Sequence, residues 1–256
     1  MITSNQNSKV KLVRALLGRS KERHEAGAFV VEGVRLVEEA VKANWKCRFA
    51  LYDETLSERG MLQVEGLRLK GVDVEEVSAS VMKSISETEA PQGILAVLEL
   101  TQLPITNKLT FILIPDQIRD PGNLGTLLRS AMAAGVQAVL IPPETTDAFA
   151  PKVLRSGMGA HFRLPIHSMS WDEISNAVKK IQVYAADMDG ASCWETDLRQ
   201  PVALIIGSEA DGVSESARKL ATGSISIPMS GGTESLNAGM AGSVLMFEVL
   251  RQRANK

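Results

Sequence analysis

The chain has 256 residues, of which 45% are hydrophobic and 23% charged, a balance that excludes disordered and collagen-like proteins. Its formal net charge of −2 excludes a protein that coats nucleic acid over its whole surface, because such binding needs many cationic contacts with phosphates. The apolar runs are much shorter than the roughly 20 residues of a membrane-spanning helix. The polar start of the chain lacks a secretion signal. We therefore expect a cytoplasmic protein without a membrane segment.

In the first half of the chain, short apolar runs alternate with segments of helical period. A basic amphipathic helix is expected from Val10 to Leu17. The strands expected after it lie near residues 29–31, 49–52, 72–77 and 93–100. This alternation favours a mixed or parallel sheet covered by helices. Residues 101–108 combine proline, threonine and asparagine without periodicity, as in a linker. We place one domain at residues 1–102 and a second at 103–256.

Cationic residues cluster near the start of the chain. Between residues 9 and 35, seven lysines and arginines stand against three glutamates. By itself this basic segment fits a solvated helix face or an RNA-binding surface, and charge alone does not decide between them. Aromatic residues make up only 4% of the chain, which argues against a base-stacking platform for single-stranded nucleic acid.

The second half of the chain repeats the strand and helix alternation. Its strands are expected near residues 111–114, 138–141, 183–186, 203–206 and 225–227. A long helix from about Leu236 to Arg253 closes the series. Its spacing of three and four predicts one buried face, made of Leu236, Met240, Val244, Phe247 and Leu250.

Three loops rich in glycine and polar residues follow strands of this second half, where ligands bind in open α/β sheets. They cover residues 115–125, 207–212 and 227–237. In the first, Asn123 is the expected N-cap of a helix that carries Arg129. Dinucleotide, phosphate-loop and hydrolase fingerprints are missing. The two cysteines and three histidines show no metal-ligand spacing, so no metal is expected.

These three loops resemble the signature motifs of the SpoU (TrmH-like) RNA methyltransferase family. The first motif has its asparagine and arginine at Asn123 and Arg129, and the second has Gly207, Glu209 and Gly212. The third combines Ile-Pro-Met at 227–229 with Ser-Leu-Asn at 235–237. Another family-typical stretch contains Pro151, Arg155, Ser156, Gly159 and Ala160, ahead of a strand expected at 163–166. The chain departs from the family after Asn237, where glycines at 239 and 242 are expected to loosen the helix start.

The resemblance implies an α/β protein of SPOUT type, whose C-terminal parallel sheet contains a deep trefoil knot. It implies S-adenosylmethionine as cofactor and a ribose 2'-hydroxyl of RNA as methyl acceptor. The implied cofactor-binding residues are Gly207, Gly212, Ile227, Met229 and Leu236. The implied catalytic residues are Asn123, Arg129, Glu209, Ser235 and Asn237. Absence of a side chain at Gly207 is expected to let the main chain approach the ligand. Family members pair through their knotted domains, which implies a homodimer.

The first half is similar to the substrate-binding domain of rRNA-directed members, at residues 2–4, 9–11 and 29–35. This similarity favours RNA contact by the basic segment, with candidates Lys9, Lys11, Arg14, Arg23 and Arg35. Arginine stays protonated in proteins, so we assign Arg129 to a substrate phosphate and to the developing alkoxide rather than to proton abstraction. The alternatives are a tRNA 2'-O-methyltransferase and a catalytically silent RNA-binding assembly factor on the same fold.

Overall fold

The computed structural model describes residues 1–231 and 235–254. It contains two compact units, which are described separately below. The first comprises Met1–Thr101 together with Phe149–Phe162, and the second comprises Gln102–Ala148 and Arg163–Lys256. The segment Phe149–Phe162 thus groups with the first unit, although it falls within the second expected domain. In the part of the chain that the structure describes, no helix is long and apolar enough to cross a membrane.

The first unit is built on a mixed four-stranded sheet in the order β1-β4-β2-β3. Strand β4 runs antiparallel to both of its neighbours, whereas β2 and β3 are parallel. The strands are β1 (Ala28–Glu32), β2 (Cys47–Tyr52), β3 (Asp73–Glu76) and β4 (Ile94–Glu99). The helices are α1 (Ser8–Gly18), α2 (Ser20–Ala26), α3 (Val34–Lys42), α4 (Glu58–Leu69) and α5 (Ala79–Ser84).

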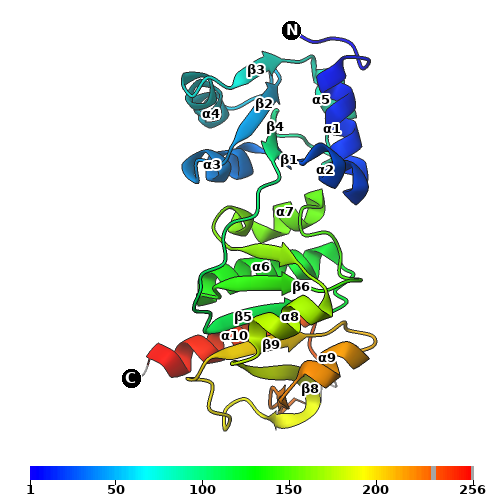
Figure 1. Cartoon of the computed structure of the whole chain (residues 1–256). Helices are drawn as coiled ribbons and strands as arrows, with labels where there is room; N and C mark the ends of the chain where they lie inside the picture. Colours follow the sequence, from blue (N-terminus) through cyan, green and yellow to red (C-terminus); the bar gives the residue numbers. More distant parts are fainter. Residues whose placement is uncertain (232–234, 255–256) are drawn as a thin grey trace. The chain divides into compact units, whose positions relative to one another are not determined.

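Two layers of helices cover this sheet (Figure 1). Helix α1 buries Val10, Val13 and Leu16, spaced by three, in a core that also contains Val81 and Met82 of α5. Helices α3 and α4 cover the opposite face (Figure 1). The later helix α7 (Pro151–Gly157) also packs on β1. The charged and polar side of α1 therefore remains at the surface of the unit.

The second unit is built on a six-stranded parallel sheet in the order β10-β8-β9-β5-β6-β7. Its strands are β5 (Phe111–Pro115), β6 (Ala138–Ile141), β7 (Ile166–Ser168), β8 (Gln182–Ser192), β9 (Val202–Ile206) and β10 (Gly223–Ser226). The central strands β5 and β9 are buried along their whole length, as expected for a parallel sheet covered on both faces. The strand expected at residues 163–166 is misplaced, because β7 begins only at Ile166.

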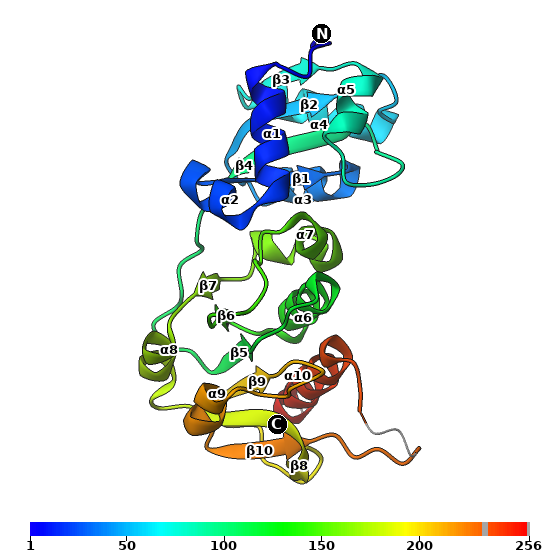
Figure 2. The ribbon, with the colours of Figure 1, turned by 90° about the vertical axis from the view of Figure 1, so that its right-hand side faces the viewer.

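Helices α6 (Pro121–Ala134) and α10 (Ala238–Ala254) cover one face of this sheet, and α8 (Trp171–Val178) and α9 (Glu215–Leu220) cover the other (Figure 2). Alternate strand residues such as Ile112 and Ile114 pack with Ile174 of α8 and Ala217 of α9, since successive side chains of a strand point to opposite faces. Both faces of the sheet are thus covered by apolar helix surfaces.

The face of α10 predicted to be buried is in fact largely exposed. Met240, Phe247 and Leu250 are 58%, 46% and 38% exposed, whereas Leu245 and Val249 are buried. Helix α10 packs against α6 through its glycines: a Cβ on Gly242 would lie 2.3 Å from Leu127 Cδ2. The glycines that were expected to loosen the helix start thus allow close contact with α6, and this contact decides which face is buried.

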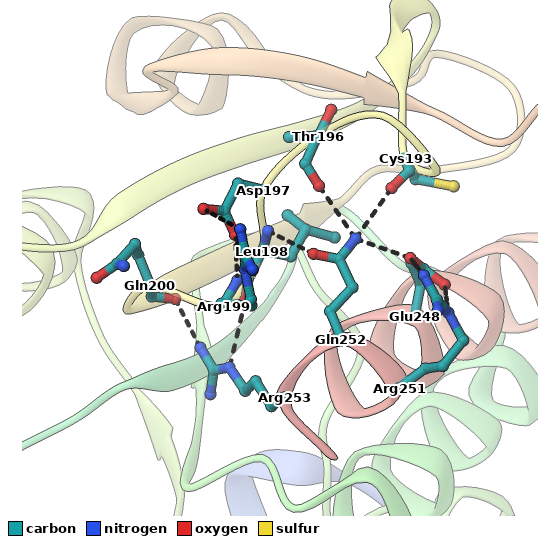
Figure 3. Close-up of polar contacts among 10 residues, drawn as sticks. All are labelled: Cys193, Thr196, Asp197, Leu198, Arg199, Gln200, Glu248, Arg251, Gln252 and Arg253. Atoms are coloured by element: carbon teal, nitrogen blue, oxygen red, sulfur yellow. Dashed lines mark hydrogen bonds and ion pairs between the residues drawn. The ribbon is translucent and has the colours of Figure 1, made fainter. Parts of the chain in front are cut away.

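The last turns of α10 are fastened to the segment 193–200 between β8 and β9 (Figure 3). Gln252 Nε2 donates to the carbonyl oxygens of Cys193 (3.4 Å) and Thr196 (3.0 Å) and to Glu248 Oε1 (2.7 Å). Gln252 Oε1 accepts the backbone N–H of Leu198 at 2.9 Å. Arg253 adds bonds to the carbonyl oxygens of Leu198, Gln200 and Thr110. We call Glu248, Gln252 and Arg253 the α10 anchor.

Candidate functional site

The site lies at the carboxyl ends of the second unit's central strands. After β5, helix α6 begins with Asp120 as its N-cap, whose side chain accepts the backbone N–H of Asn123 at 2.8 Å, and with Pro121 in the first turn. The prediction that Asn123 caps this helix is therefore wrong. Since Asp120 already satisfies that end of the helix, the side chain of Asn123 can bind elsewhere.

The loop after β9 is closed by two backbone hydrogen bonds between Ser208 and Gly212. Ser208 N–H donates to Gly212 O at 2.9 Å and Gly212 N–H to Ser208 O at 3.1 Å, and Gly212 has a φ of +66°, which glycine adopts without strain. A Cβ on Gly207 would lie 2.3 Å from the backbone of Gly212. The structure thus gives Gly207 a further reason to be glycine besides ligand approach. The loop carries Glu209 at its tip.

Asn123, Glu209 and Asn237 form one hydrogen-bonded cluster, which we call the site network. Glu209 Oε1 accepts Asn123 Nδ2 at 2.8 Å, Asn237 Nδ2 at 2.6 Å and the backbone N–H of Ala238 at 3.1 Å. Asn237 Nδ2 also donates to Asn123 Oδ1 at 2.8 Å. Three loops distant in sequence therefore meet at one carboxylate, and the side-chain amides are held by charge-assisted bonds.

A cavity of about 340 Å³ opens beside the site network. All the residues predicted to bind the cofactor line it, namely Gly207, Gly212, Ile227, Met229 and Leu236. Glu209 and Ser235 line it as well. Residues 232–234 of the third loop lie outside the described residues. A mostly apolar wall with a few polar groups, at this size, is typical of small-molecule sites.

Several lining residues were missed by sequence analysis, including four on β8 and α9. Ala186, Asp187 and Met188 lie in β8, and Arg218 lies in α9. The first three could have been found, because β8 was expected to end near residue 186 and ligands bind where parallel strands end. No sequence signal singled out Arg218, since a charged residue on a short helix is ordinarily a surface residue.

Arg129 lies apart from this cavity. It sits on α6 six residues after Asn123, which corresponds to about 9 Å of helix rise and a different side of the helix. Its side chain is exposed, and it makes no hydrogen bond or ion pair with any residue that the structure describes. Asn123, Glu209, Ser235 and Asn237 are thus gathered at the cavity and its network, whereas Arg129 is not brought to the cavity within one chain.

A buried carboxylate binds the start of α9, just after the loop that carries Glu209. Asp116 directly follows β5, is 1% exposed and accepts the backbone N–H of Ser214 through Oδ2 at 2.6 Å. Its Oδ1 has no hydrogen-bond partner among the described residues. Burial raises the pKa of Asp116, which the bonds from Ser214 partly oppose. Asp116 therefore holds the start of α9 against the end of β5.

The predicted RNA-binding residues of the first unit differ in availability. Lys11, Arg14 and Arg35 are exposed. Lys9 pairs with Asp73 and Glu75, and its pKa is raised by these partners although burial opposes the rise. Arg23 is only 3% exposed and donates to Leu16 O at 2.7 Å, at the end of α1. Its predicted surface role is corrected to a structural one.

Two family models match the chain. Residues 110–247 match the SpoU rRNA Methylase family, and residues 7–96 match the MRM3-like substrate binding domain. The first match contains the site network and all the cavity residues discussed above. The second contains the basic segment.

Two characterised relatives are similar to almost the whole chain. A 23S rRNA (uridine(2479)-2'-O)-methyltransferase of Streptomyces viridochromogenes is 32% identical over 98% of this chain and 92% of its own length. The 23S rRNA (guanosine(2553)-2'-O)-methyltransferase RlmP of Bacillus subtilis is 33% identical over 97% and 98%. The crystal structure of the SpoU methyltransferase AviRb from Streptomyces viridochromogenes, in complex with the cofactor AdoMet, has a TM-score of 0.84. Its identity is 31%, and it covers 98% of this chain and 100% of its own.

Proposed function

Because the chain belongs to the SpoU rRNA methylase family, we propose that it transfers a methyl group from S-adenosylmethionine to a ribose 2'-hydroxyl of ribosomal RNA. The observation that carries this proposal is the meeting of three motif loops at the site network beside one cavity. We propose that residues 1–102 bind RNA and that residues 103–256 carry out methyl transfer. We also propose that the protein is cytoplasmic.

The cavity fits the proposed cofactor. Its volume of about 340 Å³ lies within the range of small-molecule pockets. Ile206, Ile225, Ile227, Leu236 and Leu245 supply apolar surface for a nucleoside. The loops also supply polar groups, including Ser208 and Ser235. When bound, S-adenosylmethionine supplies an activated methyl group on its sulfonium. The deep trefoil knot that the family implies around these loops is part of the proposal.

The chain's own residues position the acceptor and stabilise charge. The site network fixes Asn123 and Asn237 so that their polar atoms present a set geometry to the ribose. Preorganised donors of this kind stabilise charge that develops in a transition state. We assign Arg129 to a phosphate of the RNA and to the developing alkoxide, with a substrate phosphate as acceptor of the hydroxyl proton, because arginine stays protonated.

We propose a homodimer in which Arg129 of each subunit serves the cavity of its partner. Within one chain Arg129 does not line the cavity, so the site is incomplete without another copy. The exposed apolar residues Met240, Phe247 and Leu250 of α10, on a helix that packs beside α6, offer a surface for this pairing. Light scattering on the full chain tests it, and a fully active monomer would contradict it.

We propose that Lys11, Arg14 and Arg35 contact RNA phosphates. Of the five predicted RNA-binding residues, these three are exposed, and Arg14 is oriented by Asn5 and Ser84. Each lost phosphate contact removes roughly 0.7 to 0.9 units from the log-log salt slope of binding. The triple alanine variant is therefore expected to bind RNA more weakly with a shallower slope, and the variant Lys9→Ala serves as a comparison because Lys9 is already paired.

Incubation of the protein with labelled S-adenosylmethionine and separate rRNA and tRNA pools tests the function. We expect label in rRNA only, at a nucleotide that becomes resistant to alkaline cleavage. Labelled tRNA would favour the alternative substrate, and binding without transfer would favour a silent assembly factor. In Arg129→Ala we expect turnover to fall by roughly 100-fold or more, while cofactor affinity stays unchanged. Near-normal turnover would remove Arg129 from the proposed mechanism.

A further inference from the structure

Charged side chains of both signs line the cavity. Besides Glu209, whose Oε1 is occupied by the site network, the lining includes the carboxylate of Asp187 and the guanidinium of Arg218. Neither belongs to the three signature loops. A purely apolar or nucleoside ligand would leave this cation and this anion without a charged partner.

Arg218 is oriented but not fully bonded. Its Nε donates to the carbonyl oxygen of Val213 at 3.2 Å, which fixes the plane of the guanidinium. Within the described ranges 1–231 and 235–254, no acceptor lies within hydrogen-bonding distance of Nη1 or Nη2. The side chain is 59% exposed. The two terminal nitrogens are therefore available to a planar anion, which guanidinium binds through two parallel bonds.

Asp187 stands opposite Arg218 at the edge of a hydrogen-bonding contact. Asp187 Oδ2 lies 4.0 Å from Arg218 Nη1, and Oδ1 accepts the backbone N–H of Asp189 at 3.1 Å. Such a loose ion pair, with the Arg218 side chain 59% and the Asp187 side chain 29% exposed, contributes little stability of its own. Each of the two groups can therefore leave this ion pair and bind a ligand at a small cost in free energy.

We propose that Arg218 and Asp187 bind the amino-acid end of S-adenosylmethionine, Arg218 its carboxylate and Asp187 its ammonium. This inference rests on the proposed function. A zwitterion presents both charges on one carbon, so it satisfies the cation and the anion of the wall together. The apolar part of the cavity, with Ile225, Ile227 and Leu236, then takes the nucleoside. The pair is a specificity determinant, because it distinguishes the intact cofactor from nucleosides that lack the amino acid.

Calorimetry on the full chain tests the inference with two ligands, S-adenosylmethionine and 5'-methylthioadenosine, which keeps the nucleoside and sulfur but lacks the amino acid. In Arg218→Ala we expect affinity for S-adenosylmethionine to fall roughly 10- to 100-fold, the effect of losing charged hydrogen bonds. Affinity for 5'-methylthioadenosine should not change. Asp187→Asn should show the same selectivity with a smaller loss, and Arg218→Lys should restore part of the affinity.

Lys219→Ala is the matched control, because Lys219 lies on the same helix and pairs with Glu215 without lining the cavity. Binding of 5'-methylthioadenosine by a variant also shows that its cavity has folded. Equal losses for both ligands, or no loss for either, would overturn the inference while leaving the proposed function intact. Failure of the wild-type chain to bind S-adenosylmethionine would overturn the proposed function and, with it, the inference.

Discussion

The two ends of helix α10 are held by different kinds of partner. At its start, Asn237 binds the side chains of Asn123 and Glu209, and the neighbouring Leu236 is 38% exposed. At its end, Gln252 and Arg253 bind main-chain groups of residues 193–200 and of Thr110. We expect the side-chain bonds at the cavity to position groups for methyl transfer, and the main-chain bonds at the other end to fix the path of the chain. Activity and stability are therefore expected to separate along a single helix.

Among these variants, Glu209→Ala should have the largest effect on turnover. It changes the site network at the start of α10. It removes the acceptor shared by Asn123, Asn237 and the N–H of Ala238, so the amides lose their set positions. We expect turnover to fall by about 100-fold or more, with little change in thermal stability because Glu209 is exposed. Single-turnover methylation and thermal melts measure the two quantities. A large stability loss would show that the site end is structural too.

Gln252→Ala should show the reverse pattern at the anchor end. It removes three donated bonds and one accepted bond, and it leaves main-chain groups without their partner. We expect a loss of about 2 kcal/mol in the free energy of unfolding and nearly unchanged turnover per folded molecule. Urea unfolding measures the loss. Gln182→Ala is the control, because Gln182 is an exposed glutamine in β8. If Gln252→Ala inactivated a stable protein, the separation of the two ends would fail.

Gly242→Ala tests whether the middle of α10 couples its ends. The added Cβ would lie 2.3 Å from Leu127 Cδ2 and 3.2 Å from Ile206 Cγ1, so α10 must move from α6 or Leu127 must repack. We expect a net destabilisation of about 1 kcal/mol, together with weaker cofactor binding. Gly66 of α4 has open space around it. The matched variant Gly66→Ala should therefore gain about 0.5 to 1 kcal/mol. Stabilisation by both substitutions would contradict close packing at Gly242.

The smallest expected effect concerns acid stability at the anchor. Hydrogen bonding to Arg251, the largest cause, lowers the pKa of Glu248 from its ordinary value of 4.5, and burial opposes this shift. A lowered folded-state pKa stabilises the protein above the unfolded-state pKa, and this stabilisation is lost as pH falls through the folded-state pKa. The difference in melting temperature between wild type and Glu248→Gln should thus shrink below about pH 4.5. A difference independent of pH would contradict this.

Much of the second unit could be predicted from sequence. Buried parallel strands are continuous apolar runs, so β5, β6 and β9 stood out. The family motifs identified the cavity residues Gly207, Ile227 and Leu236. These predictions depend on local composition and on motif order, which the sequence displays directly.

The wrong predictions concern features that depend on tertiary packing. Helix α10 has apolar residues on several sides, so their spacing does not identify the buried face, and the contact of Gly242 with α6 does. Charge alone could not show that Arg23 is buried or that Lys9 is paired. Asn123 and Asp120 are both residue types that cap helices. Pro121 in the first turn favours Asp120 as the cap. Arg218 could not be found because only the fold brings α9 to the cavity.

The long-range hydrogen bonds of α10 also affect how fast the protein folds and unfolds. Asn237 meets a residue 114 positions earlier, and Arg253 meets one 143 positions earlier. Contacts between such distant residues slow the folding reaction, because closing the long loop between them costs entropy. A cofactor that requires the finished cavity binds the native state and not the transition state. Bound cofactor should therefore slow the unfolding of the protein and leave its folding rate unchanged.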